Sequence, residues 1–403
     1  MIKKIAVADL QVGMYIHDLN LGWLDHNFLR NQFAVKSEAT VRKVRSLGVH
    51  ELYIDTDRGL DVANAPTAEE ETVALTQRLE AIAETPWVVP PQVTLADEVR
   101  RARKLHGEAH RIVKDMMADI RLGQQIEMKK VEPLVEQVVD SIFRHPDALI
   151  PLARLKTHDD YTFLHSVSVC ALMVAFARSL NLPRDIIKEV AIGALLHDVG
   201  KARVAEGILN KPAKLTEAEF AKMKSHVVQS KIILANTPGV SQIALEVAAQ
   251  HHERFDGTGY PNRLQGDAIS LYGQMGAIVD VYDAITSNRV YHKGMAPSEA
   301  LKKLLEWSKF HFNPDLVQAF IRSIGIYPSG SLVRLASNRL GVVMEQNEGK
   351  LLQPKVRIFY HAGRRSYVEP EVVDLSRPRA GDAIVGCEDP EHWGLDIHPW
   401  LPG

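Results

Sequence analysis

The sequence has few cysteines, no long apolar run and almost no net charge, and each absence excludes a class of protein. Only Cys170 and Cys387 occur among 403 residues, which argues against a disulfide framework and favours a reducing compartment. No apolar run reaches the roughly 18 residues of a membrane-spanning helix, and the first residues, MIKKIAVADLQVGM, lack the apolar segment of a signal peptide. The formal net charge of −2 gives no electrostatic case for binding nucleic acid. We therefore expect a cytoplasmic protein without membrane insertion.

Hydrophobic periodicity and local composition predict a mainly α fold with a small β-containing region at each end. The first residues have short β-capable runs around a helical segment at 40–47, and the segment 58–72 loses hydrophobicity and gathers acidic residues, as in a linker. We predict four regions: a small α+β module at 1–60, a linker with long helices at 61–148, a helical domain at 149–327 and a β-rich appendage at 328–403.

Helical periodicity is strongest in the middle of the chain. A long pattern from Leu95 to Ile142 predicts helices that connect domains or form a dimerisation surface, with interruptions at Gly123 and Pro133. Thr216 followed by Glu219 is a capping-box pattern and predicts the start of a later helix. Each segment between about 161 and 253 carries apolar residues at helical spacing.

Histidines and aspartates recur across the helical domain in a pattern that indicates metal binding. His197 and Asp198 are adjacent within GALLHDVGK, and further candidates are His165, His226, His251, His252 and Asp280. A lone histidine on an apolar helix is usually structural, but a buried His–Asp pair is costly unless it is paired or binds a metal. An adjacent His and Asp can give one ligand to each of two ions, or the carboxylate can bridge them.

The doublet His251–His252 and the pair Asp280 and Asp283 refine this prediction. Successive helical residues point about 100° apart, so the two histidines serve different ions or different sides of one site. Asp280 and Asp283 share a helix face. We expect Asp280 to be a ligand and Asp283 to orient a ligand or an arginine, with a solvated Asp283 as the alternative.

A glycine-containing loop follows the doublet, with the sequence DGTGYP. Gly257 and Gly259 permit positive φ and a close approach of the backbone to a ligand. Such a loop alone is an ordinary turn, but directly after two candidate ligands it is expected to form the rim of the site. Tyr260 there is able to stack on a base.

The motifs HDVGK, HHERFDGTGYP and DVYDAITSNRVYHKGM, with YTFLHSVSV before them, resemble the HD-GYP family of HD hydrolases. The resemblance covers about residues 150–325, and the N-terminal part also resembles a small module that often precedes such domains in bacteria. It implies a helical HD-type bundle whose metal centre hydrolyses cyclic di-GMP. The family pattern assigns as metal ligands His165, His197, Asp198, His226, His251, His252 and Asp280.

The resemblance also implies substrate-binding positions. Asp198 is the expected bridging carboxylate, and Lys201 matches a family lysine near the scissile phosphate, although it is otherwise an ordinary lysine beside Gly200. Substrate contacts are implied for Gly259, Tyr260, Pro261, Arg289, His292 and Lys293. His292 stands where the family usually has a lysine or arginine, a departure that bears on phosphate affinity. Some members bind a third metal through a glutamate at the position of Tyr161, so two ions are expected here.

The chemistry follows from two metal ions that activate a hydroxide and clamp the phosphoryl oxygens, with Lys201 adding positive charge or protonating the leaving 3′ oxygen. Histidine and carboxylate ligands without thiolates favour iron or manganese and leave zinc open. We expect hydrolysis of cyclic di-GMP to pGpG, and the sequence leaves open whether pGpG or GMP is the end product. Two alternatives stay open: another cyclic dinucleotide or nucleotide as substrate, and a non-catalytic module that binds cyclic di-GMP or a protein partner, with the GYP loop as the contact. A homodimer is also compatible with the sequence.

Overall fold

The computed structural model describes residues 1–21, 32–84, 91–153, 161–211, 213–287, 294–347, 349–378 and 381–402, with the side chains of 161 and 162 left out. The chain forms two compact units: Met1–Arg78 with Glu206–Lys222, and Leu79–Ala205 with Met223–Gly403. The predicted domain boundaries at 60, 148 and 327 stay predictions.

The first unit contains a small antiparallel sheet whose strands lie in the order β1-β4-β2-β3. The strands are β1 (Ile2–Ala6), β2 (Tyr15–Asp18), β3 (Phe33–Ala34) and β4 (Glu51–Asp55). Alternate residues of β4 are buried, because successive strand side chains point to opposite faces. Leu52 and Ile54 share one core with Val41 and Val44 of α1 (Glu38–Arg45), so the predicted strand and helix are confirmed.

Two helices that begin in this unit start with reciprocal caps. α2 (Ala68–Ala83) follows Thr67, whose Oγ accepts from the Glu70 N–H at 3.2 Å while the Glu70 carboxylate accepts from the Thr67 N–H at 2.8 Å. The acidic stretch expected within a linker therefore forms a helix start, where negative charge is favourable. The predicted capping box of Thr216 and Glu219 is confirmed at the start of α9 (Glu217–Ala235), which follows α8 (Glu206–Leu209).

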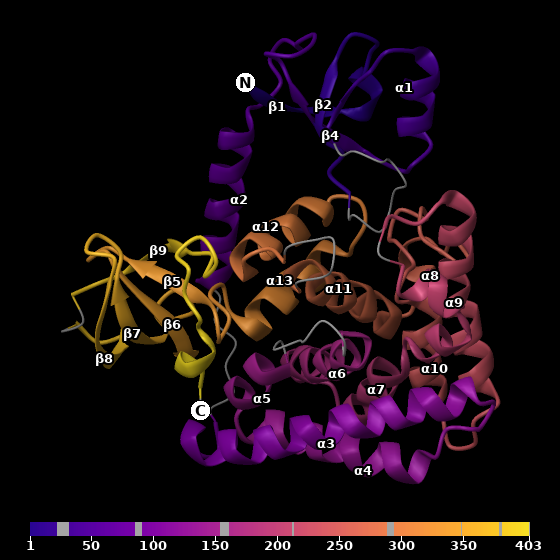
Figure 1. Ribbon diagram of the computed structural model, residues 1–403, viewed down its shortest axis with the longest axis vertical. Helices are drawn as coiled ribbons and strands as arrows, with labels where there is room; N and C mark the ends of the chain where they lie inside the picture. The colour runs from indigo at the N-terminus through magenta and orange to yellow at the C-terminus, as the bar shows by residue number, and fades with distance from the viewer. Residues whose placement is uncertain are drawn as a thin grey trace. The chain divides into compact units, whose positions relative to one another are not determined.

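The second unit is a helical bundle with α6 at its centre. Its helices are α3 (Leu95–Arg121), α4 (Met128–Arg144), α5 (Pro146–Ala153), α6 (Tyr161–Ser179), α7 (Arg184–Leu196), α10 (Gln242–Gln250), α11 (Leu271–Thr286), α12 (Pro297–Trp307) and α13 (Pro314–Ile324). Residues 164–177 of α6 are buried on all sides, unlike a helix with a single apolar stripe, because α3, α4, α5, α7, α11 and α13 surround it (Figure 1). Among the described residues, no helix combines the length and apolarity that a bilayer crossing requires.

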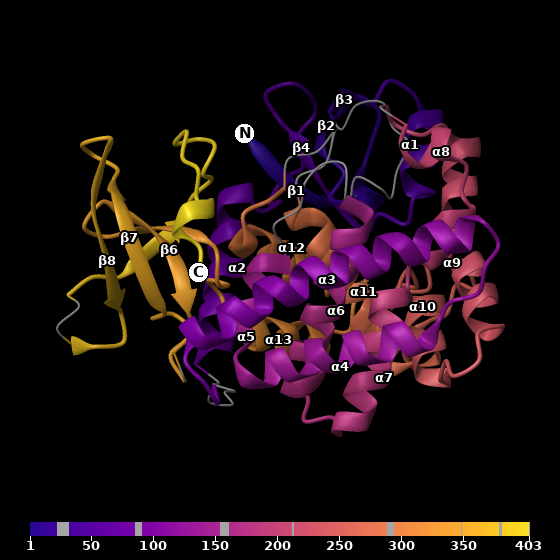
Figure 2. The ribbon, with the colours of Figure 1, turned by 60° about the horizontal axis from the view of Figure 1, so that its bottom comes forward.

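The predicted long helical stretch forms α3 and α4, which pack against each other (Figure 2). The interruption expected at Gly123 is confirmed, since α3 ends at Arg121. The interruption expected at Pro133 is wrong, because α4 continues through this proline in its second turn. Proline there removes one backbone hydrogen bond. The buried face of α4, which includes Val131 and Leu134, holds the helix together against that loss.

The chain ends in a five-stranded antiparallel sheet in the order β8-β7-β6-β5-β9. Its strands are β5 (Leu332–Leu335), β6 (Arg339–Glu345), β7 (Lys355–His361), β8 (Ser366–Asp374) and β9 (Ile384–Cys387). Alternating residues build two cores: Leu340 and Phe359 belong to one, and Val343 and Ile358 to the other. Both faces are therefore partly covered, and the predicted β-rich end is confirmed.

Candidate metal centre

Five elements bring the predicted ligands together. His165 lies in α6, His226 in α9 and Asp280 in α11. His197 caps the C-terminus of α7, Asp198 follows it before the short 3-10 helix η2 (Val199–Arg203), and His251 caps the C-terminus of α10. All of these side chains are buried, whereas the next residue, His252, keeps 19% of its side chain exposed. The α6, α7, α10 and α11 helices that carry four of these positions contact one another in sequence around the site.

Asp198 lies between two groups of imidazoles. Its Oδ1 lies 3.3 Å from Nε2 of His226 and 3.9 Å from Nε2 of His251. Its Oδ2 lies 3.6 Å from Nε2 of His165 and 3.2 Å from Nε2 of His197. The two oxygens of one carboxylate therefore face different histidine pairs, which is the arrangement that a carboxylate shared by two ions needs.

Asp280 extends the site in the same way. Its Oδ1 lies 3.0 Å from Nε2 of His165 and 3.9 Å from Nε2 of His197, and its Oδ2 lies 3.8 Å from Nδ1 of His252. Three overlapping sets have ligand atoms within 4.8 Å of one another: His165, His197 and Asp280; His197, Asp198 and His251; and His226, His251 and His252. Ligands at about 2.0–2.2 Å from an ion lie up to roughly 4.4 Å apart, so each set is close to the size of one coordination sphere.

The histidines are oriented by hydrogen bonds from their other ring nitrogen. Nδ1 of His197 lies 2.7 Å from the Ala194 carbonyl, and Nδ1 of His226 and of His251 makes the same contact with the carbonyl three residues earlier, at 2.7 and 2.9 Å. A carbonyl oxygen only accepts, so Nδ1 carries the proton and the lone pair of Nε2 points into the centre.

A carboxylate holds His165 in the same manner. Asp283 is fully buried, and its Oδ2 lies 2.5 Å from Nδ1 of His165 while its Oδ1 accepts from Ser168 Oγ at 2.5 Å. This is the orienting contact predicted for Asp283, and a solvated role is excluded. Ser168, one turn after His165 on α6, was not predicted, since a serine in an apolar helix carries no distinctive signal.

Protonation in the cluster suits cation binding. Burial raises the pKa of Asp198, but the charges of His197 and Lys201 outweigh burial and hold this pKa well below its usual range. Burial, together with the neighbouring His197, lowers the pKa of His251 to about 3, so His251 is a neutral imidazole at pH 7. Burial lowers the pKa of His197, but the charge of Asp198 outweighs burial, so the net shift of this pKa is upward.

Unsatisfied polar atoms test whether these residues fit metal ions. Nε2 of His197, His226 and His251 and Oδ1 of Asp198 are buried and make no hydrogen bond of acceptable geometry with the described residues. Buried polar atoms without partners are rare in native proteins, because each costs a desolvation penalty. Their convergence, with two ionised carboxylates and no thiolate, fits divalent cations.

Lys201 and Gly200 follow the His–Asp pair in η2. The ammonium of Lys201 forms an ion pair with Asp198 Oδ2, at the edge of the cluster. Gly200 packs directly on α9: a Cβ at this position would lie 2.0 Å from the carbonyl oxygen of His226, and its N–H donates to Ser230 Oγ at 2.8 Å. Gly200 and Ser230 therefore set the spacing between Asp198 and His226, a role that was not predicted because it depends on contact between distant segments.

Glu253, which was also not predicted, anchors the residues that directly follow the GYP motif. This buried carboxylate accepts from the N–H groups of Asn262 at 2.7 Å and Leu264 at 3.0 Å, and burial raises its pKa. The signal was a charged residue directly after the histidine doublet. Gly257 has a φ of 81°, as expected, whereas Gly259 is required for space, since a Cβ there would lie 2.3 Å from the Arg254 nitrogen.

Tyr260 packs against the cluster. Its ring stacks on His252 with centroids 4.7 Å apart, and the Lys224 ammonium lies 5.5 Å from its centroid. Its peptide bond to Pro261 is cis. Tyr260 therefore contacts a candidate ligand directly, and its predicted contact with a base stays a prediction.

Three predicted substrate contacts, Arg289, His292 and Lys293, lie outside the described residues, as does the side chain of Tyr161. Their roles, and the expectation of two ions over three, stay predictions.

Two domain families and several known proteins are similar in sequence to this chain. Residues 2–131 match a domain of unknown function (DUF3391), and residues 136–316 match the HD domain. The chain is 43% identical over 396 residues to the cyclic di-GMP phosphodiesterase PA4108 of Pseudomonas aeruginosa, across 98% of this chain and 94% of that protein. It is 42% identical over 138 residues to the 3'3'-cGAMP-specific phosphodiesterase 2 of Vibrio cholerae, across 34% of this chain and 26% of that protein.

Among solved structures, the HDG"Y"P protein Bd1817 from Bdellovibrio bacteriovorus aligns with 79% of this chain and 98% of its own, with a TM-score of 0.48 and 18% identity. The near full-length relationship to the Pseudomonas protein, together with the HD-domain match, shows the family. The chain belongs to the HD-GYP family of HD-domain proteins and carries an N-terminal DUF3391 domain.

Proposed function

We propose that this chain is a cyclic di-GMP phosphodiesterase that works with two divalent metal ions, held by His165, His197, Asp198, His226, His251, His252 and Asp280. The observation that carries the proposal is the position of Asp198, whose two oxygens face different pairs of imidazoles. The identity of 43% over almost the whole chain to a cyclic di-GMP phosphodiesterase supports the substrate. Histidine and carboxylate ligands favour iron or manganese, with zinc as the alternative.

The metal ions, when bound, supply an activated water and neutralise charge on the phosphoryl oxygens. The protein contributes oriented ligands, since Nδ1–H bonds fix four of the five imidazoles, those of His165, His197, His226 and His251, before substrate arrives. One water adds to phosphorus, the bond from phosphorus to the 3′ oxygen breaks, and that oxygen takes a proton. The product is the linear pGpG, and a second hydrolysis gives two GMP.

Lys201 is the proposed charged group beside the reacting phosphate. Its ammonium lies against Asp198, so it is within reach of a phosphate bound at the cluster and can stabilise negative charge or protonate the leaving oxygen. Gly259, Tyr260 and Pro261 form the proposed rim for the guanine base. Arg289, His292 and Lys293 are proposed phosphate contacts on the family resemblance alone.

The direct test is hydrolysis of cyclic di-GMP by the full chain loaded with Mn²⁺, or with Fe²⁺ under reducing conditions. Chromatography should show loss of cyclic di-GMP and formation of pGpG. His197→Ala and Asp198→Ala should lose both bound metal and turnover, because each substitution removes a proposed metal ligand. His398→Ala is the matched control, since the side chain of this histidine is 68% exposed and forms an ion pair with Asp396, which is not one of the proposed ligands.

Two results would contradict the proposal. No conversion by the metal-loaded wild-type chain would exclude the activity. A metal-free chain that still binds cyclic di-GMP tightly would instead indicate a non-catalytic binding module.

A second candidate substrate, 3'3'-cGAMP, is supported by similarity to a protein specific for it. The central segment is 42% identical over 138 residues to a 3'3'-cGAMP-specific phosphodiesterase, so the same metal centre can serve a mixed cyclic dinucleotide. We expect cyclic di-GMP to have the higher kcat/KM when the two substrates compete in one reaction. Faster turnover of 3'3'-cGAMP would reassign the substrate.

The compartment and protein partners are also proposals. Cys170 and Cys387 are both free thiols, which suits the cytoplasm. A partner protein at the GYP loop and a homodimer remain proposals from the family resemblance and the helical texture. Size-exclusion chromatography with light scattering tests the dimer.

A further inference from the structure

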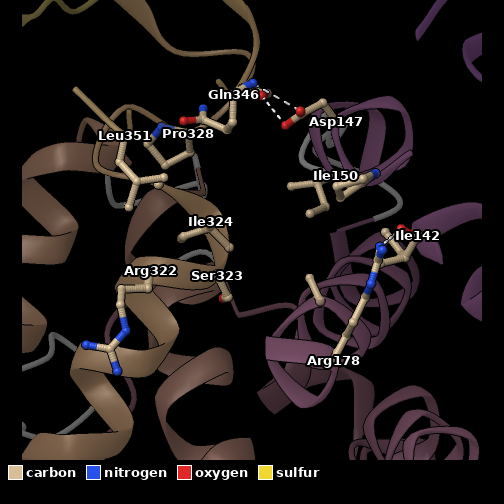
Figure 3. A pocket seen from close by; sticks show the side chains of 14 residues that line it. Ile142, Asp147, Ile150, Arg178, Arg322, Ser323, Ile324, Pro328, Gln346 and Leu351 are labelled. Atoms are coloured by element: carbon tan, nitrogen blue, oxygen red, sulfur yellow. Dashed lines mark hydrogen bonds between the residues drawn. The ribbon is translucent and has the colours of Figure 1, made fainter. Parts of the chain in front are cut away.

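A pocket of about 70 Å³ lies away from the metal centre, between the helical bundle and the start of the C-terminal sheet. Its walls come from α4, α5, α6 and α13 and from segments that flank β5 and β6. Figure 3 shows apolar side chains on both sides, Ile142 and Ile150 facing Ile324 and Leu351. Most of the lining is therefore hydrocarbon, which alone would suit an apolar occupant.

Arg178 breaks this apolar character. It comes from the last turn of α6 and is only 7% exposed. Its Nη1 donates to the Ile142 carbonyl at 2.7 Å, and its guanidinium lies 4.7 Å from the Phe143 ring centroid. No ion pair to Arg178 is formed by any described residue, and Nε and Nη2 have no hydrogen-bond partner among them. A buried arginine is normally paired, so this charge lacks its usual counter-ion.

Asp147, the acid that lines the same pocket, does not serve as that counter-ion. Its oxygens already accept from Ser329 Oγ at 2.5 Å and from the Gln346 N–H at 3.1 Å (Figure 3). Burial raises the pKa of Asp147, which favours its neutral form. Arg322 also lines the pocket, but Figure 3 shows its guanidinium directed away from the other lining side chains.

We propose that this pocket binds a small carboxylate, with Arg178 holding the carboxylate group and the isoleucine and leucine side chains enclosing a short hydrocarbon part. The planar guanidinium fork matches a carboxylate in two parallel hydrogen bonds. A cavity needs about 10–15 Å³ for one water, so this volume suits roughly five to seven non-hydrogen atoms. Phosphate fits less well, because its extra charge and oxygens would face hydrocarbon.

The site is independent of the hydrolase chemistry. Arg178 and His165 lie on the same helix, about 20 Å apart along its axis at 1.5 Å per residue. Failure of this proposal would therefore leave the metal centre and its reaction unchanged.

Propionate is the probe, titrated into the full chain by calorimetry and by ligand-observed NMR, with sodium chloride at equal ionic strength as the reference. We expect saturable binding of one propionate per chain with a Kd of about 1–10 mM, because so few atoms make contact. Ala175→Leu adds a side chain to the pocket wall and should abolish binding. Ala118→Leu, the same change on an exposed face of α3, should leave binding unchanged.

Arg178→Lys is the second variant, since it keeps the charge and removes the planar fork. It should weaken propionate roughly tenfold or more. The proposal is overturned if wild type shows no saturation by about 100 mM, or if the folded Ala175→Leu or Arg178→Lys chains bind propionate as wild type does. Inorganic phosphate that binds more tightly than propionate, and is lost in Ala175→Leu, would overturn the ligand class.

Discussion

Asp283→Asn tests whether the metal centre depends on how its histidines are held. The substitution keeps the shape of a fully buried side chain and removes its charge. In the wild-type chain the Asp283 carboxylate contacts Nδ1 of His165 and accepts from Ser168 Oγ, both at 2.5 Å. A charge-assisted hydrogen bond contributes about 1.5–3 kcal/mol and a neutral one about 1 kcal/mol, so the loss at His165 is about 1–2 kcal/mol.

That loss should appear as weaker metal binding. We expect the dissociation constant for Mn²⁺, measured by competition with a chromogenic chelator, to rise roughly 5- to 30-fold, which is the equivalent of that loss, and kcat at limiting metal to fall in parallel. Ser168→Ala is the matched control, because it removes one hydrogen bond to Asp283 and leaves the contact with His165. If Asp283→Asn binds metal and turns over within about twofold of wild type, the proposed orientation of His165 by its Nδ1–H bond is wrong.

Three further predictions address packing and charge. Gly200→Ala should lower metal content and activity more than tenfold, because its Cβ would meet the His226 carbonyl at 2.0 Å; normal metal content would contradict this. Glu98→Gln should destabilise the fold by about 2–4 kcal/mol at pH 7 in urea unfolding, since the buried carboxylate accepts from Arg144 at 2.6 and 2.8 Å. Burial raises the pKa of Glu98, but Arg144 and Ser141 outweigh it and lower the pKa, so the stabilisation is present above the unfolded pKa of about 4.3 and is lost as pH falls through the folded value. The gap to wild type should therefore narrow on acidification below about pH 4.5, and a constant gap would refute the pairing. Glu253→Gln should raise KM for cyclic di-GMP more than it lowers kcat, because the GYP loop loses its anchor; an equal loss in both would indicate a wider collapse.

The ligand residues could be predicted from the sequence because their chemistry is unusual for their surroundings. His197 and Asp198 follow the end of one apolar helix, and the doublet His251–His252 follows the end of another, so each pair carries a local signal. The mainly helical fold and the β-rich end followed from periodicity in the same way.

What the sequence left open depends on contacts between distant segments. The requirement for glycine at position 200 arises only because the backbone of α9 packs against it. The hydrogen bonds of Glu253 form only because the loop folds back and brings residues about ten positions later next to its carboxylate. The start of α2 was missed for a different reason: acidic residues indicate either a solvated linker or a helix N-terminus, and low hydrophobicity favoured the first. Pro133 shows the converse, since tertiary packing outweighs a local helix breaker.

The backbone carbonyls that hold His197, His226 and His251 belong to the same helical turn as each imidazole. The orientation of each imidazole is thus set by the helical turn that precedes it. One residue inserted just before the histidine would rotate the ring by about 100°, away from the cluster. Length variation among natural relatives should consequently accumulate in the connections between these helices, while the turn that precedes each of the three histidines should tolerate point changes and reject insertions or deletions.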